Sequence, residues 1–173
     1  NVFAAAQPNP PRYATNNSPV IQIVPGVVPE KATQWEFAKG EWSAESFYVA
    51  RFSGDFDKAE QGFGFGVGYS LTENVVVSVL TTSYLEQPQF INEVAGRITY
   101  RVQVPFIPIK HVAAYGFGEG GGNLQTGDGF GGAGAGLQYR FLKNLDLKLE
   151  SGVRLSTEWQ SSVGILAAVG FHF

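Results

Sequence analysis

The chain has 173 residues, a net charge of −3 and 16% charged residues, where soluble domains average about 25%. No run of basic residues is present to supply the electrostatic attraction that nucleic-acid binding requires, so nucleic acid is excluded as a partner. The lack of cysteine excludes disulfides, zinc–thiolate sites and cysteine nucleophiles.

Residues 1–42 form the first predicted unit, an irregular arm. Six of the nine prolines fall within its first 29 residues, and a short β-prone stretch lies at Val20–Val24. Phe3–Ala6 is too short for a signal peptide and lacks a charged flank, so we expect a mature chain. We expect the arm to dock on a second copy of the chain or on another protein, with contact residues Val20, Ile21, Ile23, Val24, Trp35 and Trp42.

Residues 43–173 form the second predicted unit, in which apolar and polar residues alternate with turn signals between the segments. No apolar run approaches the ~20 residues of a membrane helix. Eight similar segments in succession predict an all-β fold, an eight-stranded antiparallel up-and-down barrel. The segments are 44–53, 61–72, 75–86, 91–104, 109–119, 130–141, 145–156 and 162–173.

Two of the predicted hairpins follow one register rule. If Leu142–Asn144 is a three-residue loop with Asn144 in the left-handed conformation, apolar residues face apolar ones. The pairs are then Phe141–Leu145, Arg140–Asp146, Tyr139–Leu147 and Gly136–Glu150. The same rule applied to the loop Thr72–Asn74 pairs Tyr69–Val77, Val67–Val79 and Gly62–Tyr84.

One face of the segments is rich in glycine, which decides between a soluble and a membrane barrel. Rows of glycine facing water weaken strands for no gain, whereas the lumen of an eight-stranded barrel is only just wide enough for side chains. Ten residues at ~3.3 Å, tilted by ~40°, span about 25 Å, the height of an outer-membrane apolar band. We therefore predict a transmembrane barrel with its apolar face toward lipid and these glycines inward: Gly62, Gly64, Gly66, Gly68, Gly132, Gly134 and Gly136.

The candidate site is a network of charges in the lumen. It consists of charged residues at those alternate positions of each strand that are predicted to face the barrel interior. It comprises Glu45, Arg51, Arg97, Arg101, Lys110, Arg140, Asp146, Lys148, Glu150 and Arg154, with Glu93 near the rim. The cations outnumber the carboxylates, which leaves two interpretations. Either buried ions pair and fill the lumen, or the cations line a narrow anion-preferring pore. We expect the filled lumen, with acidic outer loops that carry Asp55, Asp57, Glu60, Glu86, Glu119, Asp128 and Glu158.

Three stretches carry a resemblance to a known family: the hairpin LQYRFLKNLDLKLESGVRL, the segment YGFGEGGGN and the end VGILAAVGFHF. Over residues 44–173 the chain resembles small bacterial outer-membrane β-barrel proteins of the OmpA-like type. The end resembles the terminal signal read by the barrel-assembly machinery, with Val169, Phe171 and Phe173 as its residues. The resemblance implies an integral protein of the bacterial outer membrane, in contact with membrane lipid, lipopolysaccharide and that machinery.

The same family includes structural barrels, adhesion factors, small pores and lipid-modifying enzymes. We expect a structural or assembly role, with the arm associating with another copy or an envelope protein. A small anion-preferring pore is the alternative, and a lipid-acting enzyme a remote one. In lipid A deacylases the last strands carry a His-x-Ser-Asn motif, but the comparable stretch GVRLSTEWQSS has no histidine, so the general base is missing.

Two further motifs carry no site. Gly116–Gly121 fits G-x-G-x-x-G, but no helix is expected after it to hold a phosphate. Asp128 and Asn123 supply too few ligands for a calcium loop. We therefore expect no enzymatic activity, metal or cofactor.

Overall fold

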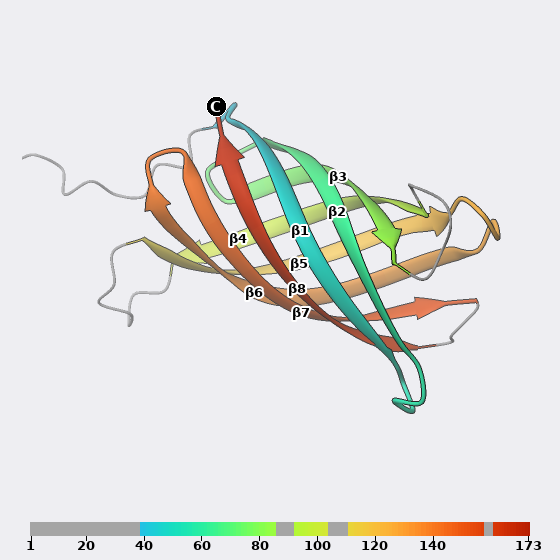
Figure 1. The fold of residues 1–173 in the computed structure, drawn as a ribbon. Helices are drawn as coiled ribbons and strands as arrows, with labels where there is room; N and C mark the ends of the chain where they lie inside the picture. Colours follow the sequence, from blue (N-terminus) through green and yellow to red (C-terminus); the bar gives the residue numbers. More distant parts are fainter. Residues whose placement is uncertain (1–38, 86–91, 104–110, 158–160) are drawn as a thin grey trace, which may run out of the picture. The chain divides into compact units, whose positions relative to one another are not determined.

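The structure, a computed structural model, describes residues 39–85, 92–103, 111–157 and 161–173. Each strand pairs antiparallel with the next and β8 pairs with β1, so the sheet closes into a barrel (Figure 1). No helix in the described ranges is long and apolar enough to cross a membrane. The strands are β1 Trp42–Ser53, β2 Ala59–Ser70, β3 Val75–Tyr84, β4 Glu93–Gln103, β5 Val112–Asn123, β6 Gly129–Leu142, β7 Leu145–Ser156 and β8 Ser162–His172.

The all-β fold and the eight strands are confirmed, but β5 is longer than predicted. The sequence predicted a loop after Glu119, whereas the strand continues to Asn123. Gly121 pairs with Ala95 of β4 on one side and with Phe130 of β6 on the other. The glycine run is therefore paired with a neighbouring strand on both sides. The predicted loop position of Glu119 is therefore wrong, since this residue lies within the barrel wall. The predicted loop position of Glu60 is also wrong, because β2 begins at Ala59 and Glu60 pairs with Arg51 of β1.

The predicted register of β2 and β3 is confirmed, and that of β6 and β7 is confirmed as far as Arg140–Asp146. Beyond that pair Leu142, rather than Phe141, pairs with Leu145, and the register shifts between Arg140 and Leu142. The extra residue is accommodated by a β-bulge in the strand instead of by the loop. The left-handed conformation predicted for Asn144 is also wrong, because Phe56 and His111 are the two described non-glycine residues with positive φ.

The inward orientation of the glycine rows is confirmed by their close neighbours. A Cβ atom on Gly64 would collide with the ring of Phe47, and one on Gly136 would lie 2.6 Å from Cζ of Tyr115. Large side chains thus occupy the space that the glycines leave. The opposite parity faces outward, and its apolar side chains are as exposed as Phe65 at 60% and Ile98 at 62%.

Residues 1–38, 86–91, 104–110 and 158–160 lie outside the described ranges. They include five of the predicted arm contacts, the predicted lumen cation Lys110 and the predicted loop acids Glu86 and Glu158. The division of the chain into residues 1–42 and 43–173 therefore remains a prediction.

Candidate functional site in the barrel lumen

Six charged side chains form a continuous ion-pair network in the half of the barrel that carries the β1–β2, β3–β4, β5–β6 and β7–β8 connections. Glu93 pairs with Arg51 (Oε1–Nη1 3.0 Å) and with Arg154 (Oε2–Nη1 2.6 Å). Glu119 pairs with Arg154 (Oε1–Nη2 2.8 Å) and with Arg97 (Oε2–Nη2 2.7 Å). Arg97 also reaches Glu150, with Nη1 2.7 Å from Oε2. We call Arg51, Glu93, Arg154, Glu119, Arg97 and Glu150 the loop-side network.

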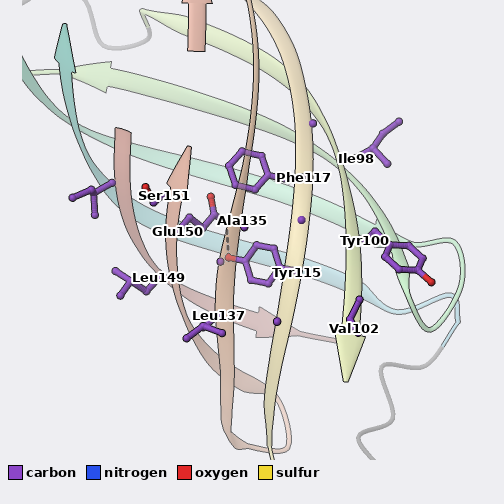
Figure 2. Close-up of a pocket in the computed structure, with 15 residues that line it drawn as sticks. Ile98, Tyr100, Val102, Tyr115, Phe117, Ala135, Leu137, Leu149, Glu150 and Ser151 are labelled. Atoms are coloured by element: carbon purple, nitrogen blue, oxygen red, sulfur yellow. Dashed lines mark hydrogen bonds between the residues drawn. The ribbon is translucent and has the colours of Figure 1, made fainter. Parts of the chain in front are cut away.

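Aromatic side chains surround this network. Tyr115 donates a hydrogen bond from its hydroxyl to Oε1 of Glu150 at 2.8 Å, as Figure 2 shows, and Tyr84 donates one to Glu93 at 3.0 Å. A guanidinium has five donors in one plane, so it can bind carboxylates at its edge while an aromatic ring packs on its face. Three ring centroids lie 3.8–4.9 Å from the Cζ atom of an arginine: Tyr84 at Arg51, Phe117 at Arg97 and Phe130 at Arg154.

A second network lies at the other end of the barrel, where β1 begins and β8 ends. Asp146 is fully buried and accepts a hydrogen bond from Gln138 while also contacting His172 Nε2. Lys148 pairs with Glu45. Glu41 lies 3.4 Å from Nη2 of Arg140 and 3.6 Å from Nδ1 of His172. We call Glu41, Glu45, Gln138, Arg140, Asp146, Lys148 and His172 the terminal-side network; Arg101, also buried, lines a cavity with Gln138 and Lys148.

The cavities that these networks line are small. Four of them have volumes of about 20, 20, 60 and 30 Å³, and a cavity needs about 10–15 Å³ to hold one water molecule. Each therefore has room for no more than a few water molecules between the side chains.

The inward charges are nearly balanced among the described residues. The six cations Arg51, Arg97, Arg101, Arg140, Lys148 and Arg154 share the interior with seven carboxylates, Glu41, Glu45, Glu60, Glu93, Glu119, Asp146 and Glu150. The sequence analysis counted more cations than carboxylates because it placed Glu60 and Glu119 in loops and did not place Glu41. Buried charges without partners are costly, so this balance favours mutual pairing.

The structure describes nine of the ten predicted lumen charges, and all nine face inward, as does Glu93. Sequence reasoning missed two carboxylates of the networks, and the predicted site did not include Gln138 or His172. Glu119 has the parity of Tyr115 and Phe117, which was a usable signal once β5 was extended. Glu41 precedes the first predicted strand, so strand parity could not have assigned it to the lumen.

The predicted terminal signal and the one described arm residue lie on the outer surface. Val169, Phe171 and Phe173 are exposed, and the rings of the last two lie 6.0 Å apart. Trp42 is exposed too, and its ring lies 5.0 Å from that of Tyr69. Their outward, apolar display fits contact with a membrane; their roles in barrel assembly and in arm contact remain predictions.

Two carboxyl groups outside the strands have lowered pKa values. A hydrogen bond from Ser53 lowers the pKa of Asp55 the most, and a hydrogen bond involving Asp57 lowers it further. Hydrogen bonds involving Thr126 and Thr157 lower the pKa of Asp128. Both carboxyl groups are thus favoured in the ionised form.

No family model matches the sequence, and no curated protein is significantly similar to it. Solved structures do resemble the fold. The N-terminal barrel domain of OprF from Pseudomonas aeruginosa has a TM-score of 0.59 and 19% identity, and the match covers 78% of this chain and 98% of that one.

Two other solved structures share the fold. Neisserial surface protein A has a TM-score of 0.58 and 14% identity, over 79% of this chain and 98% of that one. A de novo designed transmembrane β-barrel has a TM-score of 0.52 and 21% identity, over 76% and 95%. At these identities the likeness concerns the fold. The predicted resemblance is confirmed at that level: the chain has the eight-stranded barrel fold of small bacterial outer-membrane proteins.

Proposed function

We propose that this chain is an integral protein of the bacterial outer membrane with a sealed lumen and a structural or assembly role. The observation that carries the proposal is the inversion of polarity across the barrel wall. Charged side chains are paired inside, while the outer surface of the strands is apolar. In a closed barrel the backbone N–H and C=O groups of every strand are paired with a neighbouring strand, which is the condition for a sheet to cross a bilayer. The comparisons support the fold that this role requires.

The membrane location is tested by folding the chain into lipid vesicles. A membrane barrel folds only in detergent or lipid. The folded protein resists protease, and its gel mobility changes when it is heated. Recovery of a folded, soluble monomer in buffer without detergent would contradict the location.

The sealed lumen is tested by conductance across planar bilayers, with the full chain and with residues 39–173. Truncation at residue 38 keeps Glu41 and its pairing with Arg140. We expect no steady conductance steps from either protein. Steps from the full chain would contradict the sealed lumen, and steps from the truncated chain alone would make residues 1–38 the seal.

The association role rests on the sequence of the arm. Val20–Val24 is a β-prone stretch between prolines in which four of the five residues are apolar, which suits addition to a strand edge or groove of a neighbour. Deletion of residues 1–30 should reduce the oligomeric state measured in mild detergent. An unchanged oligomeric state would remove the arm from the proposal.

A further inference from the structure

An apolar groove of about 1020 Å³ runs over the outer wall of the barrel, across β4 to β8. Its floor consists of small residues that face outward from neighbouring strands, and larger side chains stand on both sides. In Figure 2, Ile98, Tyr100 and Val102 lie on the β4 side, and Leu137 and Leu149 lie on the other. Floor residues include Gly116, Gly118, Ala114, Ala135 and Ser151.

The glycines of this floor differ from those of the lumen. A Cβ atom on Gly118 would meet no atom within 4 Å, and one on Gly116 would come no closer than 3.8 Å to its nearest neighbour. The lumen glycines, in contrast, face large side chains at contact distance, as Gly64 faces Phe47. The barrel's own packing therefore explains the inner glycines and leaves the outer ones unexplained. Small residues on a membrane-facing surface let another backbone approach closely.

A matching ridge stands on the opposite wall. β2 and β6 are four strands apart in either direction around the barrel. Phe65 on β2 is 60% exposed, and its cross-strand neighbours are the small residues Ser46 and Thr81. Its ring therefore projects beyond its neighbours on β1 and β3. Phe63, whose ring lies 5.6 Å from that of Tyr48, and Val67, which pairs with the exposed Val79, extend this apolar surface along β2.

We propose that the β2 ridge of one copy packs into the β5–β6 groove of a second copy. Fluid lipid chains can adapt to a flat wall as well as to a groove, so lipid contact does not require small residues on the outer surface. A rigid ridge of side chains, in contrast, packs closely only where the opposing surface is recessed. Because ridge and groove lie on opposite walls, the contact is head-to-tail and produces open rows of barrels in the membrane plane. The inference rests on the proposed membrane location but not on the sealed lumen.

The surface is large enough for a specific contact. Four strands at ~4.8 Å spacing and a band ~25 Å tall give about 500 Å² of projected wall on each copy. That is the same order as the ~800 Å² of accessible surface that each partner buries in a standard interface.

The test uses the absence of native cysteine. The double variant Val67→Cys with Gly116→Cys places one thiol on the ridge and one in the groove. Folded into vesicles and treated with a membrane-permeant oxidant, it should give a ladder of dimers, trimers and higher species. Each single variant should stay monomeric, as should the control Val67→Cys with Ala167→Cys, whose second thiol faces outward from β8.

Three outcomes would overturn the proposal. Dimers from Gly116→Cys alone would indicate groove-to-groove contact, and dimers from Val67→Cys alone would indicate ridge-to-ridge contact. Monomers throughout would leave the groove to lipid.

Adding Gly118→Leu to the double variant should abolish the ladder, because it fills the groove. Heat-modifiable mobility should persist in every variant, so its loss would point to a failure of the membrane barrel itself.

Discussion

Glu93 accepts hydrogen bonds from two arginines and a tyrosine, and its side chain is buried. Replacing Glu93 with alanine would leave Arg51 and Arg154 buried without their shared carboxylate. Removing one partner of a buried ion pair costs about 3–5 kcal/mol. We expect the free energy of unfolding of Glu93→Ala, measured by urea titration in vesicles, to fall by that amount.

Glu60 provides the matched control, because its side chain is 20% exposed and lies 3.9 Å from Nη1 of the same Arg51. This contact is partly exposed and longer than the 3.0 Å between Arg51 and Glu93, so its contribution should be nearer the ~0–1 kcal/mol of surface pairs. Glu60→Ala should therefore reduce stability by less than about 1 kcal/mol. Equal losses from the two variants would mean that water screens the lumen charges as effectively as those at the rim.

The two classes of glycine give a second prediction at this scale. Gly64→Ala forces a methyl group against the Phe47 ring, and such overpacking costs about 1–3 kcal/mol. Gly118→Ala meets no neighbour and restricts the unfolded chain, so it should stabilise the monomer by about 0.5–1 kcal/mol. Urea unfolding of monomers in detergent micelles measures both. Destabilisation by Gly118→Ala would show that its bare backbone has a role within the barrel.

At the scale of elements, Asp128 joins the β5–β6 connection to the residue that follows β7, because its Oδ1 accepts a hydrogen bond from Oγ1 of Thr157 at 2.7 Å. The pKa of Asp128 is lowered from its ordinary value of about 3.9. The folded state thus binds this proton less tightly than the unfolded chain. The contribution to stability is present above the unfolded pKa and is lost as pH falls through the lowered pKa.

Thr157→Val removes one of these donors, so the pKa of Asp128 should rise toward its ordinary value. Carboxyl NMR titration of the folded barrel measures the change, and Thr72→Val, in the connection at the other end of the barrel, is the control. A pKa that stayed at its wild-type value in Thr157→Val would assign the whole shift to Thr126.

The elements show which features follow from alternation and which do not. Parity assigned nine described charges to the interior because a strand has a period of two, whatever its exact ends. The bulge at Phe141 was missed because one extra residue fits either a longer loop or a bulged strand with identical pairs beyond Arg140. Glu119 was missed because glycine, depleted in strands, signalled a loop where the ladder in fact continues.

At the scale of the whole molecule, closure of the barrel brings together residues that are distant in the chain. Arg97 reaches Glu150, 53 positions away, and Lys148 reaches Glu45, 103 positions away. Parity predicted that these side chains share the lumen. It could not predict their pairing, since long side chains choose among several partners across the barrel.

The two networks lie in series along the lumen, so we expect each to seal it independently. Arg154→Ala with Glu119→Ala removes one pair from the loop-side network and leaves the net charge unchanged. Lys148→Ala with Glu45→Ala does the same in the terminal-side network. Each double variant should remain silent in planar bilayers, because the other network still fills the lumen.

The quadruple variant should conduct, with weak ion selectivity because the removed charges cancel. Heat-modifiable mobility serves as the control that all three variants have folded. Conductance from one double variant alone would place the seal in that network. A silent quadruple variant would assign the seal to the side chains that remain, among them Arg51, Arg97 and Arg101, which stay buried in the lumen.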